Sequence, residues 1–356
     1  HLTYYLETNI VVQFREIEKK PQALKGTSAG KKKTLSFVKL SGDPSKNSNV
    51  GAPKMPDESR KLLYKEASAY IDEVLNALRG RKGFALEKGF EVVQKIVAQT
   101  YPQDPVLILA LHQDDWRQYV TQHPVNVAVF AIKMADHLGF DKSKQVEIGM
   151  AGLLHDVGMA AVPDKILYKQ GKLDDAEKKM FRQRPNFSSK ILRALGPKYA
   201  YLAECAVQVY ERIDGSGYPR GLKADEMHEY AQIIGLLDMY ESLIHSRPQR
   251  GKRTPFAAVK EIINTSKKHF QKHYLKALLA IFTAFPIHSY VKLNSDAIGK
   301  VIETYPDQPM RPKIQIIYDS QKRKVLTEKI VALPEDPLLH IVDSVSGTKI
   351  EKLGKG

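Results

Sequence analysis

The stretch that decides the fold of this chain is Leu153-Leu154-His155-Asp156-Val157-Gly158. It places adjacent histidine and aspartate residues at the end of an apolar helix, so one imidazole and one carboxylate reach the same point in space. Nitrogen and oxygen ligands of this kind suit a hard or borderline divalent metal ion. A metal held in this way can activate water against a phosphate ester. The pair therefore predicts a metal site, provided that other parts of the chain supply further ligands.

The composition is that of an ordinary globular protein. Its 356 residues are 43% hydrophobic and 27% charged, which leaves room for two or three domains with their own cores. No stretch approaches the roughly 18 consecutive apolar residues that span a bilayer, and no signal peptide is evident. Cys205 is the only cysteine, which excludes an intramolecular disulfide and a thiolate metal cage. We expect a cytoplasmic protein without a membrane span.

The charge balance favours anionic partners. Lysine and arginine number 55 against 40 aspartate and glutamate residues, so the formal net charge is +15. The basic residues are spread along the chain, and their densest cluster, Lys31-Lys32-Lys33, lacks the interleaved aromatic residues of a base-stacking surface. Specific nucleic-acid binding is therefore not expected, whereas a small phosphate-bearing ligand is compatible with the charge.

Hydrophobic periodicity and turn residues divide the chain into four regions. They are an N-terminal β and loop segment (1–55), a helical region (56–112), a helical domain (113–285) and a small C-terminal β domain with a tail (286–356). The third region contains a helix that begins near His123 and ends at Gly139, a helix over about 144–157 and a helix over about 228–246. The strands expected in the last region are 290–293, 313–318 and 329–333. The fold class is mainly α, with small β segments at both termini.

Two further residues are candidates for metal ligands. Asp238 lies within the apolar run Ile233–Tyr240, where a carboxylate is costly to bury unless it is paired or binds a metal. A helix N-cap or a salt bridge is the alternative, although a position in mid-helix argues against the cap. His123 is 32 residues before His155, so one helical hairpin brings both imidazoles together. Two histidines and two aspartates from three helices would form a four-ligand site with positions left for water.

The order His…His-Asp…Asp resembles the HD superfamily of metal-dependent phosphohydrolases. The segment 211–222, which contains Gly217-Tyr218-Pro219, is similar to the signature of the HD-GYP branch, and the segments 163–169 and 246–250 also match it. These blocks follow the family order over about residues 119–285, nearly half of the chain. The resemblance implies a helical bundle whose members commonly hydrolyse cyclic di-GMP, a bacterial second messenger, with two or three metal ions.

The resemblance also implies roles for individual residues. His123, His155, Asp156 and Asp238 would hold a divalent metal, Fe or Mn being favoured. His155 and Asp156 would be the catalytic pair, with Asp156 bridging two ions where two are present. The substrate would be contacted by residues of the Gly-Tyr-Pro loop and by arginines that match phosphate-binding positions, namely Gly217, Tyr218, Arg247 and Arg250.

Several family positions carry other residues in this chain. Met159 replaces a lysine, Tyr119 an acidic residue, and Arg184, Val209 and Tyr210 stand where three histidines normally complete a second metal site. A guanidinium stays protonated and cannot bind a metal, but the charge of Arg184 could replace that ion beside the substrate. We therefore expect one metal ion. A second is left open, because Gln208, Tyr210 or Glu211 could act as a substitute ligand.

Three functions are compatible with these observations. The first is a phosphodiesterase that opens cyclic di-GMP, with weak or narrowed activity because of the replaced residues. The second is an inactive receptor or protein-interaction module for a cyclic dinucleotide, with the terminal domains available to protein partners. The third is hydrolysis of another nucleotide such as a monophosphate, against which the Gly-Tyr-Pro block argues. The sequence leaves open a homodimer.

Overall fold

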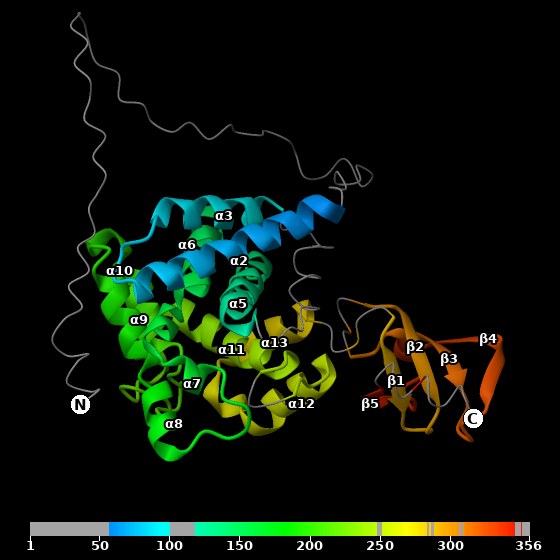
Figure 1. Ribbon diagram of the computed structural model, residues 1–356. Helices are drawn as coiled ribbons and strands as arrows, with labels where there is room; N and C mark the ends of the chain where they lie inside the picture. Colours follow the sequence, from blue (N-terminus) through cyan, green and yellow to red (C-terminus); the bar gives the residue numbers. More distant parts are fainter. Residues whose placement is uncertain are drawn as a thin grey trace, which may run out of the picture.

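Three helices lie at the centre of the bundle shown in Figure 1: α5 (Tyr119–His137), α6 (Lys142–Leu154) and α11 (Glu229–Ile244). Helix α5 packs against both of the others, and most of its side chains are buried because its sequence is apolar on nearly every face. This computed structural model describes residues 57–99, 118–247, 251–282, 285, 288–305, 308, 310–345 and 350.

The remaining helices surround this centre. Helices α2 (Asp57–Arg79) and α3 (Leu86–Ala98) cover α5 and α6 on one side. The others are α7 (Asp164–Leu167), α8 (Asp175–Phe181), α9 (Arg184–Arg193), α10 (Ala200–Gln208), α12 (Pro255–Thr265) and α13 (Lys272–Ile281). A short 3-10 helix, Val157–Ala161, directly follows the His155-Asp156 pair and packs against α9.

A tight connection between α5 and α6 fixes the position of the His155-Asp156 pair. Helix α5 ends where Gly139 adopts a left-handed conformation with φ of 79°, as its predicted role at the helix end requires. Two residues later, the side chain of Asp141 accepts a hydrogen bond from the backbone nitrogen of Lys144 at 2.9 Å and caps α6. The two helices therefore run as an antiparallel hairpin, which carries the histidines of both helices to one end.

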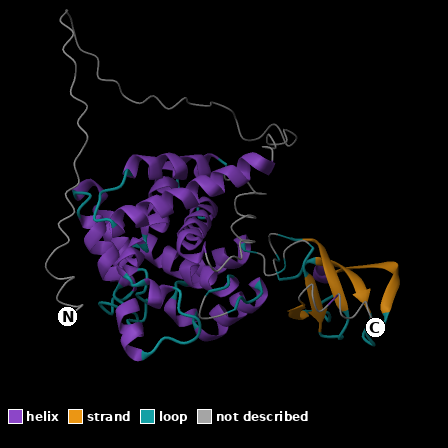
Figure 2. Ribbon diagram, in the orientation of Figure 1, coloured by secondary structure: helices purple, strands orange, loops and turns teal. Residues whose placement is uncertain are grey.

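The C-terminal part is a five-stranded antiparallel sheet, drawn in orange in Figure 2. Its strands are β1 (Tyr290–Leu293), β2 (Ile298–Glu303), β3 (Lys313–Tyr318), β4 (Lys324–Ala332) and β5 (Ile341–Val345), in the spatial order β4-β3-β2-β1-β5. Alternate residues of β3 are buried, as expected for a strand with one face on a core. That core also includes Phe256 from α12 and Phe285 from the connection.

The mainly α fold class with a C-terminal β part is confirmed. The three central helices occur as predicted, with boundaries shifted by a few residues, and α6 ends at Leu154, just before the His-Asp pair. Strands β1 and β3 coincide with their predicted ranges, while β4 begins five residues earlier than expected. Strands β2 and β5 were not predicted. The strands expected within residues 1–55 lie outside the described residues.

Within the part of the chain that the structure describes, no helix combines the length and the apolar character that crossing a membrane requires.

Candidate metal centre

Three of the four predicted metal ligands meet where the three central helices converge. His123 lies in the second turn of α5, His155 follows the last residue of α6, and Asp238 lies in the middle of α11. Together with Asp156 they are almost fully buried, with exposed fractions between 1% and 7%. Burial of so many ionisable groups in one place is costly unless they are paired or bind a cation.

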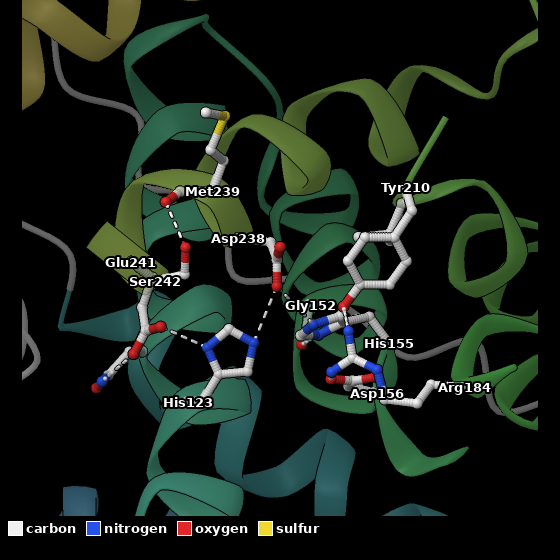
Figure 3. A network of polar contacts seen from close by, with 12 residues as sticks. His123, Gly152, His155, Asp156, Arg184, Tyr210, Asp238, Met239, Glu241 and Ser242 are labelled. Atoms are coloured by element: carbon white, nitrogen blue, oxygen red, sulfur yellow. Dashed lines mark hydrogen bonds and ion pairs between the residues drawn. The ribbon is translucent and has the colours of Figure 1, made fainter. Parts of the chain in front are cut away.

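The geometry of three of these residues fits a shared ion. Nε2 of His123 lies 3.0 Å from Oδ1 of Asp238, and Nε2 of His155 lies 3.5 Å from the same oxygen (Figure 3). One atom from each residue falls within 4.8 Å of the other two. Two donor atoms that are each about 2.1 Å from one ion lie about 3.0–3.6 Å apart, so these separations suit binding to a single cation.

Each predicted ligand also keeps one buried atom without a hydrogen-bond partner. These atoms are Nε2 of His123, Nε2 of His155, Oδ1 of Asp156 and Oδ1 of Asp238. Buried polar atoms are normally satisfied, and leaving one unpaired costs about 1–3 kcal/mol. A divalent cation would supply the partner that these atoms lack, so the residues present fit the metal that the sequence predicts.

Hydrogen bonds on the opposite side of each imidazole orient the rings for this role. Nδ1 of His155 donates to the backbone oxygen of Gly152 at 2.7 Å, and Nδ1 of His123 donates to the Glu241 carboxylate at 2.5 Å. With their protons on Nδ1, both rings present the lone pair of Nε2 to Asp238. A carboxylate or carbonyl behind a histidine is the usual support of a metal ligand.

Close contacts between imidazoles and carboxylates shift the pKa values of His123 and Asp238. Burial alone would lower the pKa of His123, but the charges of Glu241 and Asp238 overcome it and raise that pKa to about 9. Burial would raise the pKa of Asp238, whereas the imidazoles of His123 and His155 beside it hold that pKa well below its usual range. The centre thus takes up a positive charge, either as a proton or as a metal ion.

The two carboxylate oxygens of Asp156 have different surroundings. Its Oδ1 is unpaired, whereas its Oδ2 accepts a hydrogen bond from Nη1 of Arg184 at 3.0 Å. Both side chains are at least 95% buried. The Asp156 carboxylate keeps the guanidinium charged and raises its pKa despite its burial. Arg184 therefore places a permanent positive charge beside Asp156, as its position in the sequence suggested.

The Gly-Tyr-Pro loop reaches this ion pair through stacked aromatic rings. Nη2 of Arg184 donates to the hydroxyl of Tyr210 at 2.9 Å, and the ring of Tyr210 stacks on that of Tyr218 at 5.3 Å with an angle of 8°. A Cβ atom at Gly217 would lie 2.4 Å from the backbone nitrogen of Arg212, so only glycine fits at this close approach. Gly217 thus permits this close approach of the loop, and the ring of Tyr218 contacts Tyr210, the partner of Arg184.

One of the two predicted phosphate-binding arginines can be placed. Arg247 lies over the ring of Tyr119, with its guanidinium carbon 4.6 Å from the ring centre, and Nη2 is 3.9 Å from Oε2 of Glu241. Its Nε and Nη2 atoms are buried without hydrogen-bond partners, which leaves two donors for an anion. Arg250 lies outside the described residues.

Glu241 is the functional residue that sequence reasoning missed. It is buried beside the metal centre, where its Oε1 accepts from Nδ2 of Asn126 at 2.9 Å and lies 3.0 Å from Nδ1 of His245. It is three residues after Asp238 and therefore on the same face of α11, which was a usable signal. The helical periodicity indicates that Asp238 and Glu241 share one face of α11. It does not indicate that His123 of α5 packs against that face.

The suggested substitute ligands have other roles in the structure. Both carboxylate oxygens of Glu211 accept backbone hydrogen bonds within the loop, from Arg220 at 2.6 Å and Leu222 at 3.0 Å. Gln208 accepts from the backbone nitrogen of His228, and the hydroxyl of Tyr210 accepts from Arg184. Their polar groups already make hydrogen bonds that stabilise the loop and the ion pair. These hydrogen bonds argue against a role of the three residues as substitute metal ligands.

Comparisons with known proteins agree with this geometry. A family profile described as an HD domain matches residues 107–273, and a second, described as a KOW domain associated with an HD domain, matches residues 290–353. A solved structure of Bd1817, an HDG"Y"P protein from Bdellovibrio bacteriovorus, shares the fold with a TM-score of 0.53. That match covers 65% of this chain and 73% of the other at 16% identity.

Curated relatives are phosphodiesterases by name. The cyclic di-GMP phosphodiesterase PA4108 of Pseudomonas aeruginosa is 26% identical over 272 residues, which are 76% of this chain and 66% of the relative. A cyclic di-GMP phosphodiesterase of Thermotoga maritima is 32% identical over 64% of each chain. The 3'3'-cGAMP-specific phosphodiesterase 3 of Vibrio cholerae is 36% identical over 37% of this chain and 28% of its own length.

This chain spans less than two thirds of each of these relatives. The two profiles match in the order in which the helical part and the sheet occur, and the matched helical part contains every predicted metal ligand. The resemblance seen in the sequence is thereby confirmed. Residues 107–273 carry an HD domain, and a KOW domain associated with HD domains follows at residues 290–353.

Proposed function

We propose that this protein is a metal-dependent phosphodiesterase that opens cyclic di-GMP to its linear form. The observation that carries the proposal is the set of four unpaired buried atoms on the predicted ligands His123, His155, Asp156 and Asp238. The names of the relatives support the substrate class, since they are phosphodiesterases of cyclic di-GMP or cGAMP. When bound, a divalent cation supplies Lewis-acid activation of water and of a phosphate oxygen.

The side chains around the centre would position the substrate. Nε and Nη2 of Arg247 are buried without a hydrogen-bond partner, and two such donors suit the oxygens of a phosphodiester. The fixed charge of Arg184 lies beside Asp156 and would stabilise negative charge as it develops on the phosphate. Tyr218, stacked on Tyr210, would contact the nucleotide from the loop.

The ion pair between Arg184 and Asp156 supports a centre with one ion. A bridging carboxylate needs both of its oxygens for metals, but one oxygen of Asp156 already accepts from Arg184. The remaining set of two imidazoles and carboxylate oxygens accepts several first-row metals, and Fe or Mn fits the proposal best. With one ion, the enzyme lacks a symmetric clamp on the attacking and leaving oxygens, so slow turnover is expected.

The test compares purified wild type with His155→Ala, each incubated with cyclic di-GMP and manganese or iron(II). We expect wild type to form the linear dinucleotide and to retain about one ion per chain, and His155→Ala to lose both properties. His137→Ala is the matched control, because His137 lies exposed in the last turn of α5. Equal product formation by wild type and His155→Ala would refute the catalytic assignment.

A second candidate is a receptor that binds a cyclic dinucleotide without cleaving it. The observation that favours it is the burial of Met159 against Arg184, with Sδ 3.9 Å from Nη1. A thioether beside the centre can neither donate to a phosphate nor stabilise developing charge. Calorimetric binding of cyclic di-GMP without any product in the assay above would favour the receptor over the enzyme.

A further inference from the structure

Two adjoining cavities form a groove on the surface outside the metal centre. Their volumes are about 560 Å³ and 590 Å³, and Asn186 of α9 and Pro219 of the Gly-Tyr-Pro loop line both of them. We call this surface the α8–α9 groove, because helices α8 and α9 supply most of its lining. Small-molecule sites commonly have volumes of about 300–1,000 Å³, so either half could hold one nucleotide.

The α8–α9 groove is strongly cationic. Its charged lining residues are Lys178, Lys179, Arg182, Lys190, Arg193, Arg220 and one carboxylate, Asp175. Asp175 pairs with Lys178 at 2.8 Å, and Glu204 pairs with Arg193 and Arg220. Among the described residues, Lys179, Arg182 and Lys190 have no carboxylate partner. Three unneutralised cations along one groove favour a phosphate-bearing ligand.

The groove also carries groups that suit a nucleobase. The guanidinium of Arg182 lies 5.3 Å from the centre of the Tyr218 ring, so two planar groups stand together at one wall. Nδ2 of Asn186 donates to Oε1 of Gln183 at 3.0 Å, which leaves Oδ1 of Asn186 and Nε2 of Gln183 available. Planar faces bind bases by stacking, while paired amides can read donors and acceptors at a base edge.

A short connection links the groove to the metal centre. The turn from α8 to α9 directs exposed Arg182 to the groove and buried Arg184, two residues later, to Asp156. The two arginines meet again through stacked rings, because Arg182 lies over Tyr218 and Arg184 binds Tyr210. A ligand with two nucleotides could therefore occupy the groove with one while the other approaches the metal.

We infer that the α8–α9 groove is a nucleotide subsite that binds the half of a cyclic dinucleotide away from the cleaved phosphodiester. This inference rests on the proposed function for its choice of ligand. Lys179 and Lys190 would pair with phosphate, Arg182 and Tyr218 would stack on the base, and Asn186 would read its edge. Binding in the groove needs no metal, which separates it from binding at the centre.

The test measures calorimetric binding of cyclic di-GMP and of GMP to the full chain. The double variant Lys179→Gln/Arg182→Gln should bind both nucleotides at least tenfold more weakly than wild type while its metal content is unchanged. Its matched control, Lys324→Gln/Lys329→Gln, removes the same charge from exposed positions of β4 and should bind as wild type does. Arg182→Lys keeps the charge but loses the planar group, so an intermediate affinity is expected.

Metal-free His155→Ala distinguishes the two proposals. The subsite is supported if His155→Ala still binds GMP and if this binding is lost when Lys179→Gln and Arg182→Gln are introduced into the same chain. Equal nucleotide affinities for wild type and the groove variant overturn the subsite, even if wild type cleaves cyclic di-GMP. Absence of cleavage by wild type overturns the proposed function instead, while GMP binding that depends on Lys179 and Arg182 still upholds the groove. An equal loss in the β4 control would show general charge attraction and overturn the subsite.

Discussion

Arg184 donates a hydrogen bond from Nη1 to Oδ2 of Asp156 over 3.0 Å, and both side chains are almost completely shielded from water. The pair lies between the metal centre and the stacked rings of the Gly-Tyr-Pro loop. It joins two parts of the site that come from distant parts of the sequence. Loss of this contact should therefore affect both the stability of the fold and the charge around the metal centre.

Replacing Arg184 with methionine should destabilise the protein by about 3–5 kcal/mol, because the change leaves the buried carboxylate of Asp156 unpaired. Chemical denaturation with urea measures the loss. The control is Arg193→Met, whose exposed side chain lies 3.6 Å from Glu204 and should contribute less than about 1 kcal/mol. A loss for Arg184→Met no larger than that of the control would contradict the assignment of a buried ion pair.

Metal affinity should increase with pH. The folded pKa of His123 is raised from 6.5 to about 9, so in metal-free protein the protonated ring stabilises the fold fully below pH 6.5, and this stability is lost as the pH rises through 9. Metal binding must displace that proton. The apparent dissociation constant should thus fall about tenfold per pH unit between pH 6.5 and 9. Chelator competition at several pH values measures it, and a flat profile would exclude the displacement.

Replacing Glu241 with glutamine should weaken metal binding about 10- to 100-fold, because the carboxylate that orients His123 loses its charge. The variant should also lower the pKa of His123, which histidine NMR of the metal-free protein would detect. Glu204→Gln is the control, since Glu204 is partly exposed and its partners are the exposed arginines Arg193 and Arg220 and the side-chain amide of Gln208. If metal affinity is unchanged in Glu241→Gln, the carboxylate has no orienting role.

Replacing Gly158 with alanine should destabilise the fold by about 1–3 kcal/mol through overpacking. The added Cβ would lie 2.3 Å from the backbone oxygen of Arg184 and 2.7 Å from the backbone nitrogen of Ser188, so α9 would have to move. Gly251→Ala meets no atom within 4 Å and serves as the neutral control. Thermal unfolding of both variants measures the difference. Equal midpoints would show that α9 adapts without cost.

The sequence predicted the parts of the site that depend on local pattern. The apolar stripes placed α5, α6 and α11, and the spacing between His123 and His155 predicted a helical hairpin that brings their rings together. Asp238 was recognisable because a carboxylate in an apolar run has few stable environments. The position of Arg184 in the family order suggested its place near a metal site, and the structure puts it against Asp156.

Contacts between segments far apart in the chain could not be predicted from the sequence. Glu241 lies opposite His123 only because α11 packs on α5 with one particular rotation, and no local pattern specifies that rotation. Strand β5 pairs with β1 across about 50 residues, and such a partner is not encoded in either short segment. Glycine at position 299 weakens the strand signal of β2, which explains why β2 was missed.

The side chain of Phe256 ties the sheet to the bundle. It belongs to α12 but stacks on Phe285 within the core of the sheet, and the hydroxyl of Thr254 meets that of Ser344 in β5 at 2.5 Å. Helix α12 begins at Pro255, eight residues after Arg247. A molecule that binds the sheet would therefore also act on α12, the helix that follows Arg247 in the chain, so the sheet is placed to transmit binding to the helical part.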